Sequence, residues 1–539
     1  FPYQSGAMAV VDLTTNSFTR VDGGLPVNDT ERLYIEITPA YPRIPPTVHI
    51  DHHRWDYEAH VLQGRRLCLY LDPTTEWDPA AGIEGFLHRL WQWFDDAIAN
   101  RFDPTTALYH PVGGVFHRTP GTPTVVVTTP LAIRDTPFHV SHITLAPHSD
   151  DRIDVVAWQR TTGSQDSVPG LFVVLSSGLP HGGGQYISDL AVAVRGQDSR
   201  NQRKKFLAEL SKASRRLTPE QHLHVLIAVP NPHLTGETRH QLIGWRLPQP
   251  SVDQAVKLAG RRHKPSDPYT DAEPQVEWTY VDDNRTAVTT RRDHRRPVSW
   301  FSGKSIELWG CGALGSWIAD QLVRAGASMV TLRDSGYVTR GILVRQNYTE
   351  LDVGRPKVDA LADHLRAIAD NVTVVPIHGD AHNALAATID ADLVVDCTVN
   401  TAVAVQLDHQ QRAGHLRCPV MQLATDMLTI TTGDTPTTNQ LDDRLREEAA
   451  RQPSLAPFRT FWDSDNHPTL TPTLGCSMPT FHGSSADAMA IAATGVTLAG
   501  DALSREIAGG YLFTAPHSPH DVPARTAITL TDADRSNRP

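Results

Sequence analysis

The feature that most constrains the fold is a glycine-rich segment, GCGALG, which contains Gly310, Gly312 and Gly315. It follows the strand-like run KSIELW and opens a run, ALGSWIADQLVRAG, with the apolar spacing of a helix. At such a turn, glycine lets backbone N–H groups approach a phosphate, and the amino terminus of the helix favours the negative charge. The segment therefore predicts a nucleotide site at one edge of a parallel sheet.

The surrounding sequence extends this motif into a doubly wound, Rossmann-like domain, which we expect to span residues 296–539. SMVTLRD and ADLVVDC are typical of buried strands that alternate with helices. Residues 431–472 are rich in Thr, Pro, Asp and Asn, which predicts a long crossover loop. Asp334 ends the strand after the glycine motif, where a carboxylate can accept from ribose hydroxyls. These features alone suit a dinucleotide dehydrogenase and an ATP-dependent enzyme equally.

The length of 539 residues predicts several domains, at about 100 to 200 residues each. Residues 1–115 have the pattern of strands, a proline-rich corner and one helix, an α+β domain. Residues 116–295 contain strand-like runs and one helix, which predicts an α+β middle domain whose role the sequence leaves open. The whole chain is thus an α/β and α+β multidomain protein.

Net charge and hydropathy limit the classes of partner and the cellular location that we expect for the chain. The chain has 49 basic and 60 acidic residues, a net charge of −11, which gives no support to general binding of polyanions. The basic runs RRHK and RRDHRR lack interleaved aromatic residues, so we expect exposed linkers rather than a nucleic-acid site. No run of 18 apolar residues and no secretory signal is apparent, which predicts a cytoplasmic protein without a membrane span.

The five cysteines are spaced too irregularly for a zinc site or a disulfide framework. They are Cys68, Cys311, Cys397, Cys418 and Cys476. We expect Cys311, Cys397 and Cys418 to be packing residues in core strands or turns.

The segment GYVTRGILVRQNYTELDVGRPKVDAL resembles the adenylating enzymes that activate ubiquitin-like or sulfur-carrier proteins, whose hallmark is an Arg-Gln pair followed by Gly-x-x-Lys. Arg345, Gln346, Gly354 and Lys357 match it. The resemblance implies ATP and Mg²⁺ as cofactors, Arg345 as a catalytic cation, and a nucleotide held by the three glycines, Asp334, Arg345, Gln346 and Lys357. An acyl adenylate brings several negative oxygens together, so guanidinium and ammonium groups must stabilise the pentavalent phosphorus. Hydride transfer has no such need.

Two positions depart from that family. Ile342 stands where an Asn is usual, and Val399 stands where an Asp that helps to hold magnesium usually lies. Asp396, three residues before Val399, is the candidate metal ligand, or it caps its strand. If Val399 abolishes magnesium binding, the chain is a non-catalytic nucleotide-binding scaffold.

The segment HVLQGRRLCLYLDPTTEWDP, preceded by YPRIPP, resembles ubiquitin-conjugating enzymes over most of residues 30–110. The resemblance implies that Cys68 is catalytic, because a cysteine accepts an acyl group readily and leaves readily when an amine attacks. His60 stands eight residues before Cys68, where that family has an Asn that stabilises an oxyanion, and a His can donate the same hydrogen bond. We expect Arg65, Arg66 or His60 to lower the pKa of Cys68.

A second candidate nucleophile is Cys476, in TLGCSMPTFHGSSAD. It lies between the predicted crossover and a helix, where activating enzymes of this superfamily present a thioester cysteine. Nearby hydroxyl groups, such as Ser477 and Ser484, keep another acceptor open.

The order of the two segments resembles the fused activating and conjugating enzymes of bacterial ubiquitin-like systems, including those in antiphage operons. The resemblance implies that a ubiquitin-like protein is adenylated, passed to Cys476, then to Cys68, and finally to an amine of a protein target. It also implies a homodimer formed through the adenylation domain. A sulfur-carrier adenylyltransferase and a dinucleotide oxidoreductase are the competing interpretations.

Overall fold

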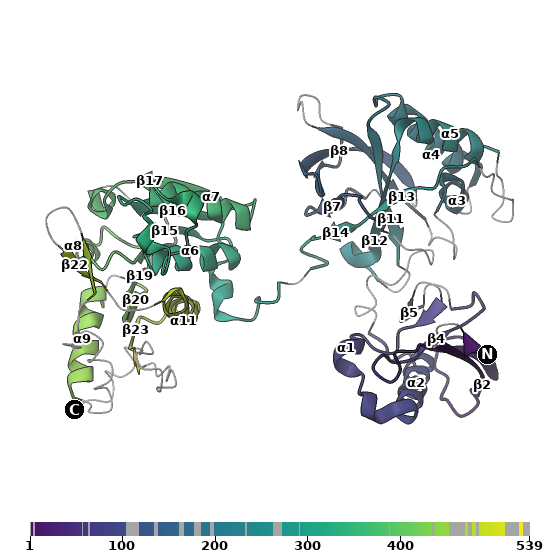
Figure 1. Ribbon diagram of the computed structural model, residues 1–539, viewed down its shortest axis with the longest axis horizontal. Helices are drawn as coiled ribbons and strands as arrows, with labels where there is room; N and C mark the ends of the chain where they lie inside the picture. Colours follow the sequence, from purple (N-terminus) through teal and green to yellow (C-terminus); the bar gives the residue numbers. More distant parts are fainter. Residues whose placement is uncertain are drawn as a thin grey trace. The chain divides into compact units, whose positions relative to one another are not determined.

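The chain forms two compact units, Phe1–Thr290 and Arg291–Pro539, and the first contains two separate sheets (Figure 1). A computed structural model describes residues 2–3, 6–55, 58–62, 65–103, 118–133, 138–160, 167–176, 185–194, 199–231, 234–261, 272–289, 291–386, 389–425, 427–433, 436–451, 469–472, 477–480, 484–512 and 528–531. The expected domain limit at 115/116 lies outside these residues, and the second unit begins five residues before the expected limit at 295/296.

The first sheet is antiparallel, in the order β1-β2-β3-β4-β6-β5. Its strands are β1 (Pro2–Tyr3), β2 (Gly6–Thr14), β3 (Thr30–Ile37), β4 (Thr47–His49), β5 (Val61–Leu62) and β6 (Arg66–Leu67), and α1 (Pro73–Glu76), the 3-10 turn η2 (Pro79–Ala81) and α2 (Gly82–Ile98) follow. Leu33 and Ile35 are buried and alternate with the less buried Tyr34 and Glu36, so one face of β3 lies in the core.

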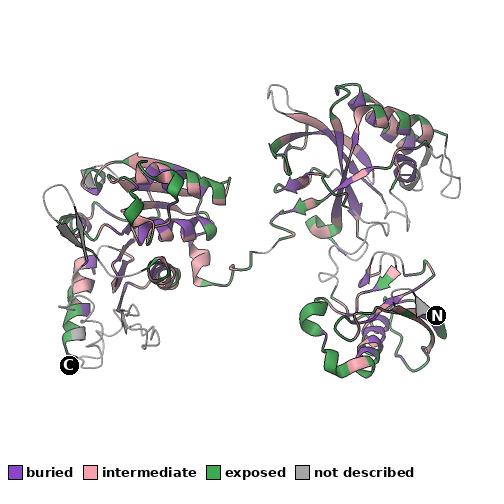
Figure 2. Cartoon of the chain, in the orientation of Figure 1, coloured by how far each residue is buried: buried purple, intermediate pink, exposed green. Residues whose placement is uncertain are grey.

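Helix α2 covers this sheet, but its buried face is narrower than its apolar pattern suggests. Phe86, Leu90 and Phe94 lie in the shared core, and Figure 2 shows this buried stripe along the helix. Ile83 and Leu87 share the apolar spacing of that face but are 45 % and 46 % exposed, because they lie on the flank of the helix that the sheet does not reach.

The middle sheet has eight strands in the order β13-β12-β11-β10-β8-β9-β7-β14. These are β7 (Thr124–Val127), β8 (His139–Ser149), β9 (Arg152–Ala157), β10 (Val168–Val174), β11 (His222–Pro230), β12 (His240–Pro248), β13 (Glu277–Thr279) and β14 (Val281–Asp283). Helices α3 (Ile187–Ala193), α4 (Ser199–Ser214) and α5 (Gln249–Ala259) pack through one apolar core onto this sheet, and η4 (Gly236–Arg239) joins two strands.

The third sheet, in the second unit, has the order β17-β16-β15-β18-β19-β20-β23-β24, of which the first five strands are parallel. The strands are β15 (Ser305–Trp309), β16 (Met329–Asp334), β17 (Thr373–His378), β18 (Leu393–Asp396), β19 (Val420–Leu423), β20 (Met427–Thr431), β23 (Gly509–Leu512) and β24 (Ile528–Thr531). A separate pair, β21 (Thr469–Pro472) and β22 (Ser477–Thr480), is antiparallel.

Helices lie on both faces of this sheet, as expected of a doubly wound domain. They are α6 (Gly315–Arg324), α7 (Lys357–Ile368), α8 (Thr401–Arg412), α9 (Thr438–Arg451) and α11 (Ser485–Ser504), with the 3-10 turns η5 (Pro297–Phe301), η6 (Arg340–Ile342), η7 (Glu350–Asp352) and η8 (Ala381–Ala386). Leu308 packs with α6, α7 and α11, whereas its neighbour Trp309 packs with α8. The carboxyl ends of β15 and β18 therefore meet where the strand order reverses, the usual ligand position in such sheets.

The expectation that residues 431–472 form a loop is wrong for the part that folds as α9. Leu441 and Leu445, one helical turn apart, are 2 % and 0 % exposed. Ion pairs one turn apart also join Arg446 to Asp442 and Arg451 to Glu447. The polar residues of this segment lie on the exposed side of the helix, and its buried apolar face is formed by these two leucines.

Helix α11 is long and apolar enough to cross a membrane by length and composition alone. Half of its most apolar window is buried, and Ile491, Ala492 and Val496 belong to the core of the second unit. A core helix passes the same test, so the finding is weak evidence for a membrane span.

Candidate active sites

The three glycines of the loop after β15 have different structural roles. Gly310 has φ +84°, and a Cβ there would lie 2.9 Å from the backbone carbonyl of Cys397. A Cβ on Gly315 would lie 1.8 Å from the carbonyl oxygen of Gly310. Around Gly312, by contrast, a Cβ would meet nothing within 4 Å. Gly310 and Gly315 are thus required by the fold, and Gly312 is the position that leaves space for a ligand.

Asp334, at the end of β16, holds this loop in place. Its Oδ2 accepts from the Cys311 amide at 2.7 Å, and its Oδ1 accepts from the Gly336 amide at 2.6 Å. Tyr348 donates its hydroxyl to the Cys311 carbonyl at 2.8 Å from the other side. Each carboxylate oxygen keeps a further lone pair, so the predicted contact with ribose remains chemically open.

The predicted cations lie on segments that touch the loop. Lys357 begins α7, and its amide donates to the Gly336 carbonyl at 3.0 Å. A Cβ on Gly336 would lie 2.9 Å from Asp334 Oδ1 and 3.5 Å from Lys357 Nζ, so the ammonium and the carboxylate share one turn. The Arg345 carbonyl accepts from Trp317 Nε1, in the first turn of α6, at 2.9 Å. The structure therefore brings Arg345 and Lys357 to the two helices that follow the glycine loop and Asp334.

A polar network that sequence reasoning missed positions the Arg-Gln pair. The amide of Asn347 donates to Ser316 Oγ at 3.1 Å. Asp320 Oδ2 lies 2.8 Å from His364 Nε2 and 3.4 Å from Asn347 Nδ2. Burial raises the pKa of Asp320, but hydrogen bonds from His364 and Arg324 outweigh it and bring that pKa below its ordinary value. The network ties the turn that carries the Arg-Gln pair to α6 and α7.

Gln346, the other half of that pair, has a buried side-chain oxygen, Oε1, without a hydrogen-bond partner among the residues that the structure describes. A buried acceptor without a partner is costly, so a bound group that donates to it would be stabilised. This observation fits the predicted role of Gln346 in nucleotide binding.

Asp396, the candidate metal ligand at the end of β18, caps the turn that follows the strand. Its Oδ1 accepts from the amide and hydroxyl of Thr398 at 2.9 and 2.7 Å, and its Oδ2 accepts from Gln422 Nε2 at 2.9 Å. It also lines a cavity of about 440 Å³ that extends to α8 and α9. Val399 lies on the same cavity with φ +52° and is 63 % exposed. A β-branched residue is strained in that conformation.

In the first unit, Cys68 follows β6 and is half-buried. Its amide donates to the His60 carbonyl at 2.8 Å, and its thiol donates to the Tyr70 carbonyl at 3.4 Å. Burial raises the pKa of Cys68, and Arg66 opposes this only in part. The expectation that neighbouring cations lower this pKa is therefore wrong in its net direction, because burial outweighs the charges. Arg65 instead donates to the Asp51 carbonyl at 3.0 Å.

His60 and Arg89 lie beside Cys68. His60 is 6 % exposed with φ +62°, and its ring lies 4.4 Å from that of Phe102. Burial, and then the charge of Arg89, lowers the pKa of His60, so the imidazole is neutral at pH 7 and retains one N–H donor. Arg89, from α2, donates to the Leu69 carbonyl at 2.6 Å. It was missed in the sequence, where its only signal is a charge between apolar residues of a predicted helix.

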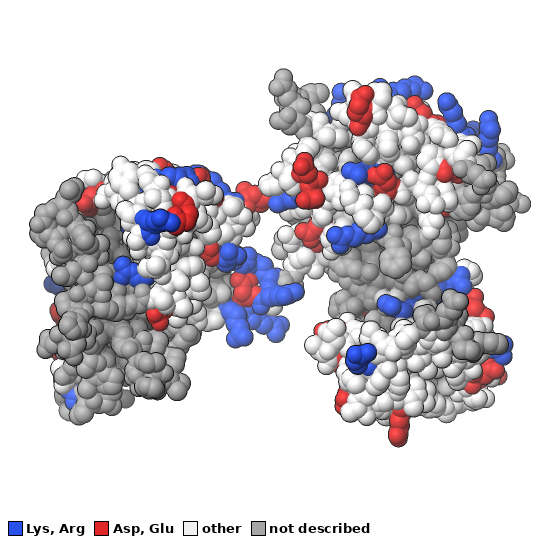
Figure 3. Space-filling view, in the orientation of Figure 1, with Lys and Arg blue, Asp and Glu red and all other residues white. Residues whose placement is uncertain are grey.

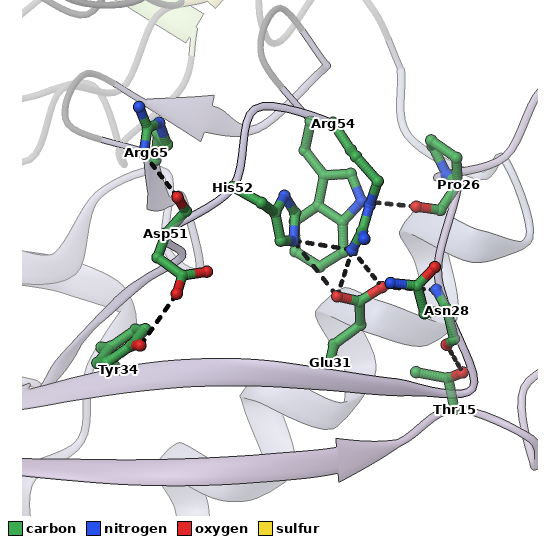
Figure 4. Close-up of polar contacts among 10 residues, drawn as sticks. Thr15, Pro26, Asn28, Glu31, Tyr34, Asp51, His52, Arg54 and Arg65 are labelled. Atoms are coloured by element: carbon green, nitrogen blue, oxygen red, sulfur yellow. Dashed lines mark hydrogen bonds and ion pairs between the residues drawn. The ribbon is translucent and has the colours of Figure 1, made fainter.

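A second network anchors the segment that leads to His60 (Figure 4). Glu31, 2 % exposed, accepts from Arg54 Nη2 at 2.7 Å and lies 3.3 Å from His52 Nε2. Tyr34 donates to Asp51 Oδ2 at 3.0 Å. A neighbouring bond, from Trp55 Nε1 to the Pro26 carbonyl at 2.7 Å, fixes the buried indole.

Of the other cysteines, Cys311 and Cys397 are buried, and burial raises their pKa well above the ordinary value, as expected of packing residues. Burial also raises the pKa of Cys418, to about 11. Cys476 lies outside the described residues.

Comparison with known proteins shows that the glycine loop and Cys68 lie in segments that match two different families. Residues 301–495 match the ThiF family, and residues 5–128 match prokaryotic E2 family A. Over 106 residues the chain is 38 % identical to the molybdopterin-synthase adenylyltransferase of Escherichia coli K12, covering 19 % of this chain and 43 % of that protein. Over 96 residues it is 41 % identical to the sulfur carrier protein ThiS adenylyltransferase of Bacillus subtilis 168, covering 17 % and 29 %.

Among solved structures, E. coli MccB with ATP covers 44 % of this chain and 65 % of its own, at 14 % identity and a TM-score of 0.29. The chain spans less than half the length of the two curated relatives. Both curated relatives are named adenylyltransferases. The chain thus joins a segment that matches prokaryotic E2 family A to a segment that matches the ThiF family.

Proposed function

We propose that the chain uses ATP to activate the carboxyl terminus of a small ubiquitin-like protein, takes the acyl group as a thioester on Cys68, and transfers it to an amine of a protein target. One observation carries this proposal: a nucleotide loop flanked by Arg345 and Lys357 occurs on the same chain as Cys68 in an E2-family segment. Activation alone would leave residues 5–128 without a role.

In the first step, a carboxylate of the carrier protein attacks the α-phosphorus of ATP, and pyrophosphate leaves. The phosphates lie against the open side of Gly312 and the amino terminus of α6. Arg345 and Lys357 stabilise the charge that develops on phosphorus. Gln346 Oε1 gains a donor, and Asp334 accepts from the ribose.

Magnesium enters with ATP as part of the substrate. Asp396 offers carboxylate oxygens, which are the hard donors that this ion prefers, whereas Val399 offers no ligand. Asp396 also directly precedes the Cys397–Thr398 backbone that Gly310 approaches. We therefore propose Asp396 as the protein carboxylate nearest to the metal.

In the later steps a cysteine thiolate attacks the acyl carbon and AMP leaves. Cys476 is our candidate for this first acceptor, and Cys68 then receives the acyl group by thioester exchange. An amine attacks the Cys68 thioester, the C–N bond forms, the C–S bond breaks, and the sulfur leaves as thiolate. The neutral His60 donates its N–H to the oxyanion of this step.

We place this activity in the bacterial cytoplasm, in antiviral defence, because the order of the two segments resembles enzymes of antiphage operons. The same resemblance supports a homodimer formed through the second unit. A sulfur-carrier adenylyltransferase is the second candidate, and the name of the Bacillus subtilis relative favours it.

The test mixes the full chain, ATP and magnesium with the small ubiquitin-like protein encoded nearest to it, and follows pyrophosphate release and adducts that thiols cleave. We expect adducts on the wild type and on Cys68→Ala, and none on Cys476→Ala. Pyrophosphate release without any thioester would favour the sulfur-carrier alternative. Adducts that survive loss of both cysteines, or that resist thiols from the outset, would refute the proposed relay.

A further inference from the structure

The chain contains only seven lysines among 49 basic residues, so 42 are arginines. No lysine occurs before residue 204, and five of the seven lie between residues 204 and 264. Arginine supplies positive charge but remains protonated, whereas lysine can supply a nucleophilic amine. The chain therefore uses arginine almost everywhere that a charge suffices, and four of its seven lysines lie on helices α4 and α5.

The absence of lysine from the first 203 residues would protect a thioester on Cys68. A thioester is attacked by amines, and a lysine beside it would divert the acyl group onto the enzyme. The E2-family segment avoids this because all of its cationic side chains are arginines. A protein that keeps amines away from its thioester but gathers them elsewhere on the same chain offers a defined acceptor.

Helix α4 presents the two adjacent amines, Lys204 and Lys205. Its buried face consists of Phe206, Leu210 and Ala213, at 0, 0 and 1 % exposure, whereas both lysines are exposed. Figure 3 shows cationic side chains gathered over α4 and α5. Within the described part of the chain, neither lysine makes an ion pair.

The remaining described lysines differ in their surroundings. Lys212 Nζ is paired with Glu209 at 2.6 Å, and Lys304 Nζ with Asp392 at 3.3 Å. Lys357 lies in the nucleotide site, and Lys257, on α5, is a single exposed amine without an adjacent lysine. Pairing with a carboxylate favours the protonated ammonium, which is not a nucleophile. Lys204 and Lys205 are thus the exposed pair of amines without such a partner.

We propose that Lys204 and Lys205 are acceptor sites at which the chain acylates itself with its carrier protein, an inference that rests on the proposed function. The neutral ε-amine attacks the carbonyl carbon of the Cys68 thioester and a C–N bond forms. The C–S bond then breaks, and the thiolate of Cys68 leaves as the amine loses its proton. The product is an isopeptide bond, which resists thiols.

The experiment incubates the full chain with ATP, magnesium and the ubiquitin-like protein encoded nearest to it, and maps adducts by peptide mass spectrometry before and after thiol treatment. The wild type should first carry a thiol-sensitive adduct on Cys68 and then a thiol-resistant adduct on Lys204 or Lys205. The double variant Lys204→Arg/Lys205→Arg retains both charges, so it should keep the thioester and lose the resistant adduct at least tenfold. Lys212→Arg is the matched control and should keep both.

The outcomes separate the two proposals. A Cys68 thioester together with resistant adducts that are absent, confined to other lysines, or unchanged in the double arginine variant would overturn the acceptor site and leave the proposed function standing. Absence of any thioester on Cys68, in the wild type and in the variants alike, would overturn both.

Discussion

Replacing Gly312 with alanine should weaken nucleotide binding without weakening the fold. The added Cβ would meet no protein atom within 4 Å, so the native state gains no strain. The unfolded chain loses freedom instead, and such a replacement stabilises a protein by about 0.4 to 1 kcal/mol. The methyl group does, however, occupy the space into which a phosphate must come. We expect ATP affinity to fall at least about tenfold, or about 1.4 kcal/mol.

The matched variant is Gly315→Ala, whose Cβ would lie 1.8 Å from the Gly310 carbonyl oxygen. Real Cβ atoms essentially never approach within 3.0 Å, so the turn must open by more than an ångström. Overpacking of this kind costs about 1 to 3 kcal/mol or more. Gly315→Ala should therefore lower thermal stability, whereas Gly312→Ala should not.

Calorimetric titration with ATP and thermal unfolding of the full chain distinguish the two effects. Binding of ATP by Gly312→Ala within twofold of the wild type would show that the open space is not the phosphate site. Unfolding of Gly315→Ala at the temperature of the wild type would show that the turn tolerates a Cβ at that position.

Three further predictions concern single positions. Because burial raises the pKa of Cys68, its thiolate fraction and its alkylation rate should still be rising with pH above pH 8.5, about the ordinary thiol pKa; a rate that has reached its plateau by pH 7 would contradict this. Val399→Asp replaces a β-branched residue at φ +52°, so it should raise the free energy of unfolding by about 1 kcal/mol. The same variant should bind ATP more tightly in the presence of magnesium. Val399→Thr is the control and should show neither effect. Arg66→Lys places an amine beside Cys68 and should produce a thiol-resistant adduct at position 66 by mass spectrometry; continued charging of Cys68 without that adduct would argue against amine exclusion.

The sequence allowed prediction of those features that local pattern determines. The glycine loop, the strands around it and helix α2 each depend on the spacing of nearby residues, and the structure has them where they were expected. The apolar pattern did not reveal that Ile83 and Leu87 are exposed, because a helix with four apolar positions per two turns offers more surface than one sheet covers.

The electrostatics of Cys68 could not be predicted, because they depend on burial and on a distant residue. Arg65 and Arg66 are close in sequence, yet Arg65 is engaged with the Asp51 carbonyl, and the apolar surroundings raise the pKa of the thiol. Arg89 reaches the site from α2, and only the packing of that helix against the sheet places it there. Helix α9 was likewise not predicted, because the composition of its segment is polar and only two leucines form its buried face.

The two hydrogen bonds that Asp334 accepts from Cys311 and Gly336 also bear on the kinetics of ligand capture. They are made by protein groups alone and fix the glycine loop to the end of the neighbouring strand, so the entropy of ordering that loop is lost when the chain folds and not when a nucleotide arrives. Association should accordingly be a single bimolecular step, with a rate proportional to nucleotide concentration, and without the slow unimolecular phase of a loop that closes over its ligand.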